Sequence, residues 1–539
     1  MDFLFKWGIF SWSVFILAIS SCLEAKPHAR FAETSPTQVL QDARAYSFLI
    51  RDHGPKPEEI NALLQGTMSL EDLQKEWLAS AAHRDRMLRY FDDMMGYRDA
   101  LILLGPNARL NKTPDGVYFS PKKGGCASAE AVNAEAWWLP EGVKARFCPN
   151  LLPTELTPEV GGKTLDCTKA GQNGFLNPAC GCGPDRIQCI AGEEANRLLQ
   201  EVQREFAERA LQVYEKNQSW LDLLAAPEFY GTRRLYWLYL QNQSQFAPAA
   251  FQEETLRTLR SLPLDKPEVR PYPAGAERSG IATAPGFLVQ YNNFRSRIAG
   301  LTRSFLCQDM NPTLNTDGIQ TFVNPSLKPT DRAHGEKADC SSCHYALDNL
   351  GGAVMPWTDR GVYQPRISSR AHAFGETGEG PAFLMRSFVE RGPGFEDCMA
   401  RRAWEDFSGQ PWAQTDEAIK SRVRNWVAEG PGHLIHTLIA SEELKQALAG
   451  NIDGGMIQDL SAQDWASMRP ILQQSCNGAS CHSTGSRQPA YADVSRLWIT
   501  DRDKLKDRLQ RTDSGQMPPR SRSLTDDDRA FLLQKILSQ

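Results

Sequence analysis

A cysteine pair near the end of the chain has the residue types and spacing that covalent haem attachment requires. Cys476 and Cys481 are separated by four residues, and His482 follows directly. Each thiol can add across a vinyl group of the porphyrin, and the adjacent imidazole then binds the iron. Met517, which precedes two prolines, can supply a thioether to the opposite haem face, as in His/Met cytochromes. A disulfide followed by a chance histidine is the alternative interpretation.

A second motif in the middle of the chain has the usual spacing of two residues. Cys340 and Cys343 flank a Ser-Ser pair, and His344 follows directly. A thioredoxin-type redox pair would require a βαβ context, and half of a zinc site would require another Cys or His pair close by. The flanking sequence offers neither. The sequence therefore predicts two covalently attached c-type haems, with His344 and His482 as the proximal iron ligands.

The sixth ligand of the iron at His344 stays open. Met355 precedes a proline, as Met517 does, but it follows His344 so closely that the intervening loop would be short. If no side chain binds, this iron is five-coordinate and accessible to a small ligand such as peroxide. Other candidates for the sixth ligand are Met310, His334, His372, His433 and His436.

The elements around the C-terminal motif must deliver its ligands to the haem. Residues 471–476 have the pattern of a helix end. The segment 524–537 has Thr525 as N-cap and Asp528 at the capping-box position, followed by apolar residues at helical spacing. With the haem motif and Met517, the segment 462–539 resembles a class I cytochrome c domain. The resemblance implies a haem bound between His482 and Met517.

The start of the chain predicts export. Lys6 precedes an apolar run at 9–19, which suits a signal-peptide core and is short for a membrane-spanning helix. The residues before Cys22 resemble the bacterial lipobox, which implies lipidation of Cys22 and, with Leu23 next, an outer-membrane lipoprotein. Cleavage near Ala25, with a soluble periplasmic product, is the alternative. Export agrees with haem attachment, which takes place outside the cytoplasm in known systems.

Eight of the 13 cysteines remain after Cys22 and the haem cysteines are set aside. An even number in an exported protein predicts up to four disulfides, whose pairing the sequence leaves open. Six of them lie at 126–189, in a segment rich in Gly, Pro and Asn, for which we expect little regular structure. Zinc or an iron–sulfur cluster at Cys180, Cys182 and Cys189 is an alternative. The eight are Cys126, Cys148, Cys167, Cys180, Cys182, Cys189, Cys307 and Cys398.

Length and pattern predict a mainly α, multi-domain protein. The chain has 539 residues and a formal net charge of −5 without a basic block, so nothing indicates nucleic-acid binding. Helices are expected from Pro57, from Ser69 as N-cap, over 193–217 and near 415–429. The expected units are a lipoprotein-type signal peptide at 1–21, a helical domain at 36–280 with a Cys-rich insertion at 101–190, a first haem region at 281–450 and the cytochrome c domain at 462–539.

The middle of the chain carries a second resemblance. The stretch from Arg297 to Thr302, the haem motif with Asp348 and Gly351 after it, and Cys398 are similar to the large exported proteins of the planctomycete-type cytochrome c family. The likeness covers about 45–440. It implies haem binding and export but names no substrate.

Two classes of function fit these features. In the first, both haems relay single electrons between partner proteins at the cell envelope, and the protein sets each reduction potential through axial ligand and burial. In the second, the protein is a haem peroxidase or oxidase in which the His482/Met517 haem feeds electrons to an open haem at His344. The sequence favours electron transfer, because no acid–base pair or nucleophile constellation stands out. A structural envelope lipoprotein is the third possibility.

Overall fold

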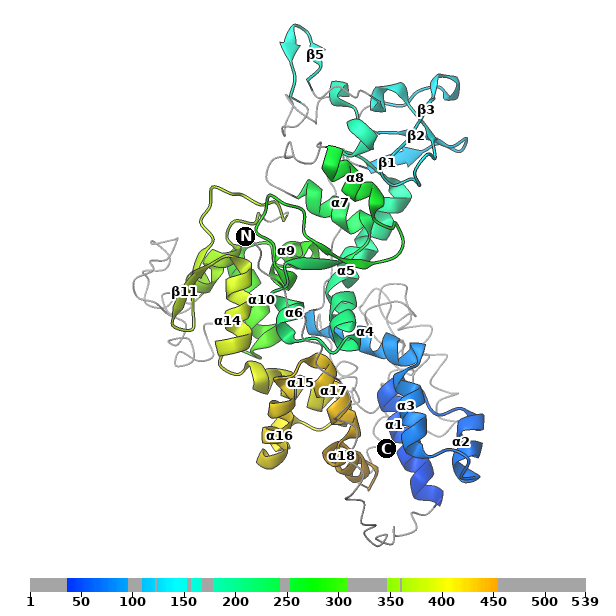
Figure 1. Ribbon diagram of the computed structural model, residues 1–539, viewed down its shortest axis with the longest axis vertical. Coiled ribbons are helices and arrows are strands. Elements are labelled where there is room, and N and C mark those ends of the chain that lie inside the picture. Colours follow the sequence, from blue (N-terminus) through cyan, green and yellow to red (C-terminus); the bar gives the residue numbers. More distant parts are fainter. Residues whose placement is uncertain are drawn as a thin grey trace, which may run out of the picture.

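The structure is a computed structural model that describes residues 36–95, 109–121, 124–152, 157–166, 178–242, 253–308, 347–358 and 361–453 (Figure 1). Helices dominate these residues, so the expectation of a mainly α protein is confirmed. The predicted cytochrome c domain at 462–539 and the signal peptide at 1–21 lie outside the described residues. No helix in the described part of the chain is long and apolar enough to cross a membrane.

Four helices begin the described chain: α1 (Pro36–Arg51), α2 (Pro57–Leu64), α3 (Leu70–Leu78) and α4 (Ala81–Met95). The two predicted helix starts are confirmed. Pro57 occupies the first turn of α2, where its missing N–H costs nothing. The Ser69 hydroxyl accepts a hydrogen bond from the backbone N–H of Asp72 and so caps α3.

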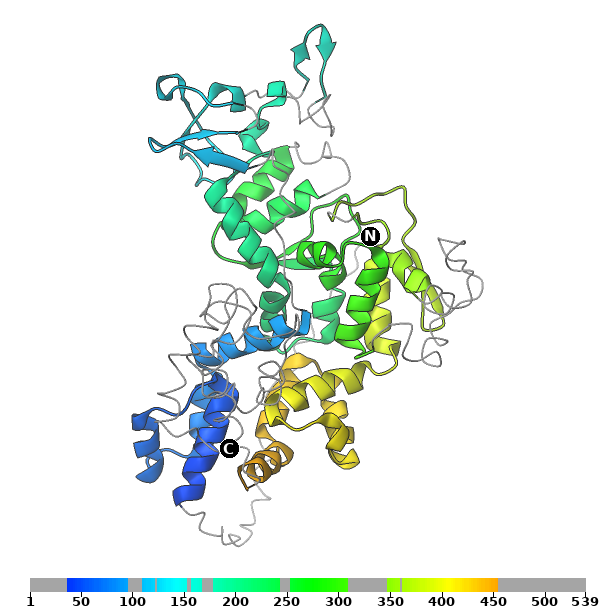
Figure 2. The ribbon, with the colours of Figure 1, turned by 180° about the vertical axis from the view of Figure 1, so that it is seen from behind.

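The long helix α5 (Gly192–Glu215) agrees with the helix expected over 193–217. It connects the upper and lower parts of the molecule in both views (Figures 1 and 2). The elements that follow it are α6 (Trp220–Leu224), β8 (Glu228–Gly231), α7 (Arg233–Gln241), α8 (Glu253–Ser261) and β9 (Glu268–Pro271), and β8 pairs antiparallel with β9.

The Cys-rich insertion is more regular than we expected. It forms a five-stranded sheet in the order β3-β4-β2-β1-β7, in which β1–β7 and β2–β4 are parallel pairs. Its strands have at most four residues each, too short for an alternating apolar pattern to show in the sequence. Buried aromatic rings and disulfides stabilise it. The strands are β1 (Arg109–Lys112), β2 (Val117–Phe119), β3 (Val132–Ala134), β4 (Ala145–Phe147) and β7 (Ile190–Ala191).

Disulfides cross-link this insertion as predicted. Cys126 is bonded to Cys148, and Cys182 is bonded to Cys189. Cys180 is also in a disulfide. The alternative of zinc or an iron–sulfur cluster at Cys180, Cys182 and Cys189 is therefore wrong, because these thiols are oxidised to disulfides and cannot act as thiolate ligands.

The C-terminal half of the described chain is a helical layer with one hairpin, β10 (Arg370–Ala373) and β11 (Glu376–Glu379). Helix α16 agrees with the helix expected near 415–429. The helices are α9 (Pro285–Gln290), α10 (Phe294–Phe305), α14 (Gly380–Arg391), α15 (Phe395–Ser408), α16 (Glu417–Val427), α17 (Pro431–Ala440) and α18 (Glu442–Asp453), with the short 3-10 helix η9 (Gly352–Val354).

The buried side chains form two hydrophobic cores, and α5 contributes to both. Leu198 and Val202 belong to the core beneath the five-stranded sheet and α7. Phe206 and Leu211, further along the same helix, belong to the core shared by α1, α4 and α10 to α18. The second of these cores therefore joins segments from both sides of residue 280.

Candidate functional site

The predicted haem attachment residues lie just outside the described chain. Cys340, Cys343 and His344 precede the point at which the description resumes, residue 347. The C-terminal set of Cys476, Cys481, His482 and Met517 lies outside the described residues, as do the candidate ligands Met310 and His334. Among the predicted iron ligands, Met355 is described. The candidate site is therefore built from the scaffold that follows the first motif.

The chain after the first motif begins as a helix over 347–351, and an ion pair fixes its start. The two carboxylate oxygens of Asp348 accept hydrogen bonds from Nε and Nη2 of Arg295 in α10, at 2.6 Å and 3.0 Å. The Asp348 side chain is almost fully buried. A bidentate arginine–carboxylate interaction fixes the orientation of both side chains as well as their separation. It therefore orients the segment that follows His344 in the sequence.

Two successive glycines let this segment pack tightly between α10 and the hairpin. A Cβ on Gly351 would lie 2.5 Å from the Phe294 ring, and one on Gly352 would lie 1.9 Å from the carbonyl oxygen of Arg370 in β10. Neither distance leaves room for a side chain. The two glycines thus permit a close approach that any larger residue would prevent.

Arg297 holds the loop that contains Met355. Its side chain is fully buried. Its guanidinium donates to the carbonyl oxygens of Val354, Trp357 and Thr358 at 3.2, 2.7 and 2.6 Å. It also donates to the carbonyls of Leu288 and Tyr291. These five bonds give the buried guanidinium its acceptors, and they fix the backbone on both sides of Met355.

Three candidate histidine ligands are described, and each has a hydrogen-bond partner. His372 in β10 lies with Nδ1 3.1 Å from the hydroxyl of Thr377. His433 and His436 lie on α17, which packs against α5 and α15. His433 pairs with Glu429 at 3.2 Å. His436 Nε2 lies 2.6 Å from the Tyr214 hydroxyl, so this nitrogen is already engaged.

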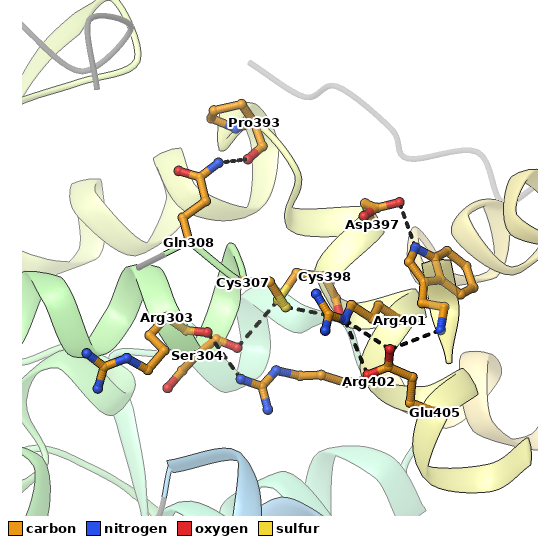
Figure 3. The surroundings of a disulfide bond; sticks show 11 residues. Arg303, Ser304, Cys307, Gln308, Pro393, Asp397, Cys398, Arg401, Arg402 and Glu405 are labelled. Atoms are coloured by element: carbon orange, nitrogen blue, oxygen red, sulfur yellow. Dashed lines mark hydrogen bonds and ion pairs between the residues drawn. A yellow bond between two sulfur atoms is a disulfide. The ribbon is translucent and has the colours of Figure 1, made fainter. Parts of the chain in front are cut away.

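A disulfide closes the chain around the first motif. Cys307 after α10 is bonded to Cys398 in α15, 91 residues further on (Figure 3). Two side chains support the junction by donating to backbone carbonyls: the Gln308 amide donates to that of Pro393 and the Arg402 guanidinium to that of Arg303, both at 3.1 Å. In the unfolded chain this cross-link lowers the conformational entropy of the long loop that it closes.

Sequence analysis identified Asp348, Gly351 and Arg297 through the family resemblance but gave them no structural role, whereas it expected Cys398 to form a disulfide. It missed Arg295, Trp357 and Arg278. The Gly-Gly pair at 351–352 was an available indication of close packing. No group of three or more His, Cys, Asp or Glu side chains suited to a metal ion occurs in the described residues.

Comparisons with protein-family models, with curated proteins and with solved structures gave no match.

Proposed function

We propose that the protein is an exported dihaem c-type cytochrome that transfers single electrons at the bacterial cell envelope. The observation that carries this proposal is the pair of motifs, Cys340-Ser-Ser-Cys343-His344 and Cys476 to His482, with Met517 after the second. A covalently bound haem supplies reversible one-electron storage at its iron.

The donor set fits a haem at each motif. At the first, Cys340 and Cys343 would hold the macrocycle and His344 would bind the iron; at the second, Cys476, Cys481 and His482 would have the same roles, and Met517 would fill the sixth position. A thioether there favours the reduced iron and raises the reduction potential. The second haem is thus suited to accept electrons.

The scaffold around the first motif supports a rigid redox centre. Arg295 and Arg297 tie the segment after the motif to α10. The apolar side chains of Leu350 and Val354 are buried in the core shared by α1, α4 and α10 to α18. A stiff, apolar setting limits the structural change on electron transfer and tunes the potential through burial.

The disulfides support an oxidising compartment. Three bonded pairs are described, and one of them spans the first motif. Structural disulfides persist in the periplasm and on cell surfaces and are rare in the cytosol. This agrees with export as a lipoprotein anchored at Cys22, on the periplasmic side and most simply at the outer membrane, where a redox partner protein would exchange electrons.

The alternative, a haem peroxidase or oxidase with an open iron at His344, has one observation in its favour. His436 Nε2 is engaged with Tyr214, and His433 pairs with Glu429, so the α17 histidines have other partners. Of the candidates for the sixth iron ligand, Met355 is then the described residue that follows the motif most closely in the sequence. If Met355 does not bind either, the iron at His344 would be open.

The test is an absorption spectrum of the purified protein, co-expressed with haem-attachment machinery. It is recorded oxidised, dithionite-reduced, and reduced under carbon monoxide, with a pyridine haemochrome count. Electron transfer predicts two haems per chain, both low-spin and unchanged by carbon monoxide. One haem that shifts with carbon monoxide would favour the enzyme, and a protein without covalent haem would overturn the proposal.

A further inference from the structure

A buried arginine, Arg278, packs against two aromatic rings, one of which belongs to the segment that follows the first predicted haem motif. The guanidinium carbon of Arg278 is 4.5 Å from the ring centroids of both Tyr239 and Trp357. Its nitrogens donate to the carbonyls of Thr283 and Tyr239, each at 3.3 Å. The side chain is 8% exposed, and within the described part of the chain no carboxylate forms an ion pair with it.

A buried cation without a partner anion is costly, because desolvation is not repaid. Burial lowers the pKa of Arg278 to about 10, which reflects this cost. Glu205, which accepts a hydrogen bond from the Tyr239 hydroxyl, cannot offset this cost fully, because burial raises the pKa of its carboxyl to about 7. We therefore expect an anionic group, from a ligand or a cofactor, beside the guanidinium of Arg278.

Four buried hydrogen-bond donors, on Arg278 itself and on residues next to it or to its aromatic neighbours, have no partner among the described residues. They are Nε of Arg278, the hydroxyl of Ser279, the indole N–H of Trp357 and the side-chain amide of Asn242, all in buried residues. Asn242 belongs to the same neighbourhood: its carbonyl accepts from the N–H of Tyr363, whose ring lies 5.1 Å from that of Trp357.

Buried polar groups in native proteins are hydrogen-bonded almost without exception, so a cluster of orphaned donors indicates an absent acceptor. Four donors and one positive charge match a carboxylate, which accepts several hydrogen bonds and prefers a guanidinium. A neutral ligand would leave the charge of Arg278 uncompensated.

We propose that Arg278, Ser279, Trp357 and Asn242 form a carboxylate-binding site. Trp357 follows His344 by 13 residues in the sequence, so a propionate of the haem proposed at Cys340 and Cys343 is one source of the carboxylate. A free organic acid is the other. The propionate source rests on the proposed function; the carboxylate site does not.

The test uses the full-length protein and three variants. Trp357→Phe removes one donor but keeps an aromatic ring over Arg278, so folding is preserved. Arg278→Gln removes the charge. Trp404→Phe is the matched control, because the indole N–H of buried Trp404 in α15 is also unpartnered but lies outside this cluster.

With a haem propionate in the site, the haem content stays at two and Arg278→Gln lowers the midpoint potential of one haem, since a nearby positive charge favours the reduced iron. Trp357→Phe shifts the propionate bands in the resonance Raman spectrum. Trp404→Phe changes neither. These readouts are independent of any catalytic activity.

With a free carboxylate, the potentials stay constant but added sodium acetate raises the thermal unfolding midpoint. Trp357→Phe then weakens acetate binding about tenfold, as expected for the loss of one hydrogen bond to a charged group. This arm remains measurable if the protein carries no covalent haem. The proposal is wrong if Arg278→Gln leaves both potentials unchanged and Trp357→Phe, like Trp404→Phe, alters neither the propionate bands nor the acetate response.

Discussion

The carboxylate of Asp348 is held by two nitrogens of Arg295, at 2.6 Å from Nε and 3.0 Å from Nη2. This pair ties the segment after the first haem motif to α10. Replacing Arg295 with Met leaves a buried carboxylate without its guanidinium, which should lower the free energy of unfolding by about 3 kcal/mol. Urea denaturation followed by circular dichroism measures the loss.

The control for Arg295→Met is Lys75→Met, which removes a solvent-exposed pair between Lys75 and Glu71 one helical turn apart in α3. Exposed pairs contribute little to stability, so its urea midpoint should match that of the parent. Equal midpoints for Arg295→Met and Lys75→Met would show that the Asp348 pair has no positioning role.

The Cys307–Cys398 disulfide should contribute more stability than the Cys182–Cys189 disulfide of the insertion. In the chain-entropy model the gain rises with the size of the closed loop. The separation of 91 residues corresponds to about 4.5 kcal/mol, and the separation of 7 between Cys182 and Cys189 to about 2.5 kcal/mol. Serine replacement of each pair, followed by urea denaturation, compares the two. A larger loss from the Cys182–Cys189 pair would contradict this prediction.

Two buried histidines should make stability depend on pH. His83 Nε2 lies 2.8 Å from the Tyr214 hydroxyl, which also contacts His436. Burial lowers the pKa of both imidazoles. The unfolded chain therefore binds more protons below pH 6.5, so the stability that the neutral rings provide is present above that pH and is lost as the pH falls.

Replacing His436 with Gln keeps a donor for Tyr214 but removes one titrating group. The fall in stability below pH 6.5 should become shallower by up to about 1.4 kcal/mol per pH unit. Unfolding free energies at pH 5.5 and 7.5, for parent and variant, measure the difference. Acidic groups with raised pKa values oppose this trend, so the test is the difference in pH dependence between parent and variant. If the unfolding free energies of the two proteins change equally between pH 5.5 and pH 7.5, His436 does not contribute to the pH dependence.

Glu205 should have the opposite effect. Burial raises the pKa of its carboxyl to about 7, so the folded state resists its ionisation. Stability is then present below the unfolded pKa of about 4.5 and falls as the pH rises through about 7. Glu205→Gln removes this penalty, so the variant should gain about 2.5 kcal/mol relative to the parent between pH 5 and pH 8. A difference between the two proteins that does not change with pH would contradict the prediction.

Local patterns predicted local structure well. Pro57 and Ser69 begin helices, and the apolar residues of α5 were recognised because the helix is long enough to show its period. The five-stranded sheet was missed because its strands are too short for alternation and its parallel pairs join segments distant in sequence. Cysteine counting predicted disulfides but could not pair Cys307 with Cys398, since pairing depends on how α10 meets α15.

For the candidate site, the sequence predicted the residues that would bind haem, and the structure showed the contacts that position the segment after the first motif. Haem motifs are recognisable because thiol and imidazole must be adjacent. The contacts of Arg295, Arg297 and Arg278 depend on helices that meet only in the folded chain, so no spacing rule reveals them. Met355 was noticed for its thioether, whereas the structure shows that its backbone is fixed by Arg297.

Helix α5 has a mechanical consequence. Leu198 and Val202 anchor its first half in one core, and Phe206 and Leu211 anchor its second half in the other. Because one continuous helix is anchored in both cores, a displacement of the sheet-bearing part would be transmitted to the core that α10 to α18 share. A partner that docks on the five-stranded sheet would therefore act on the segment that follows the predicted first haem motif through one continuous helix and not through a hinge.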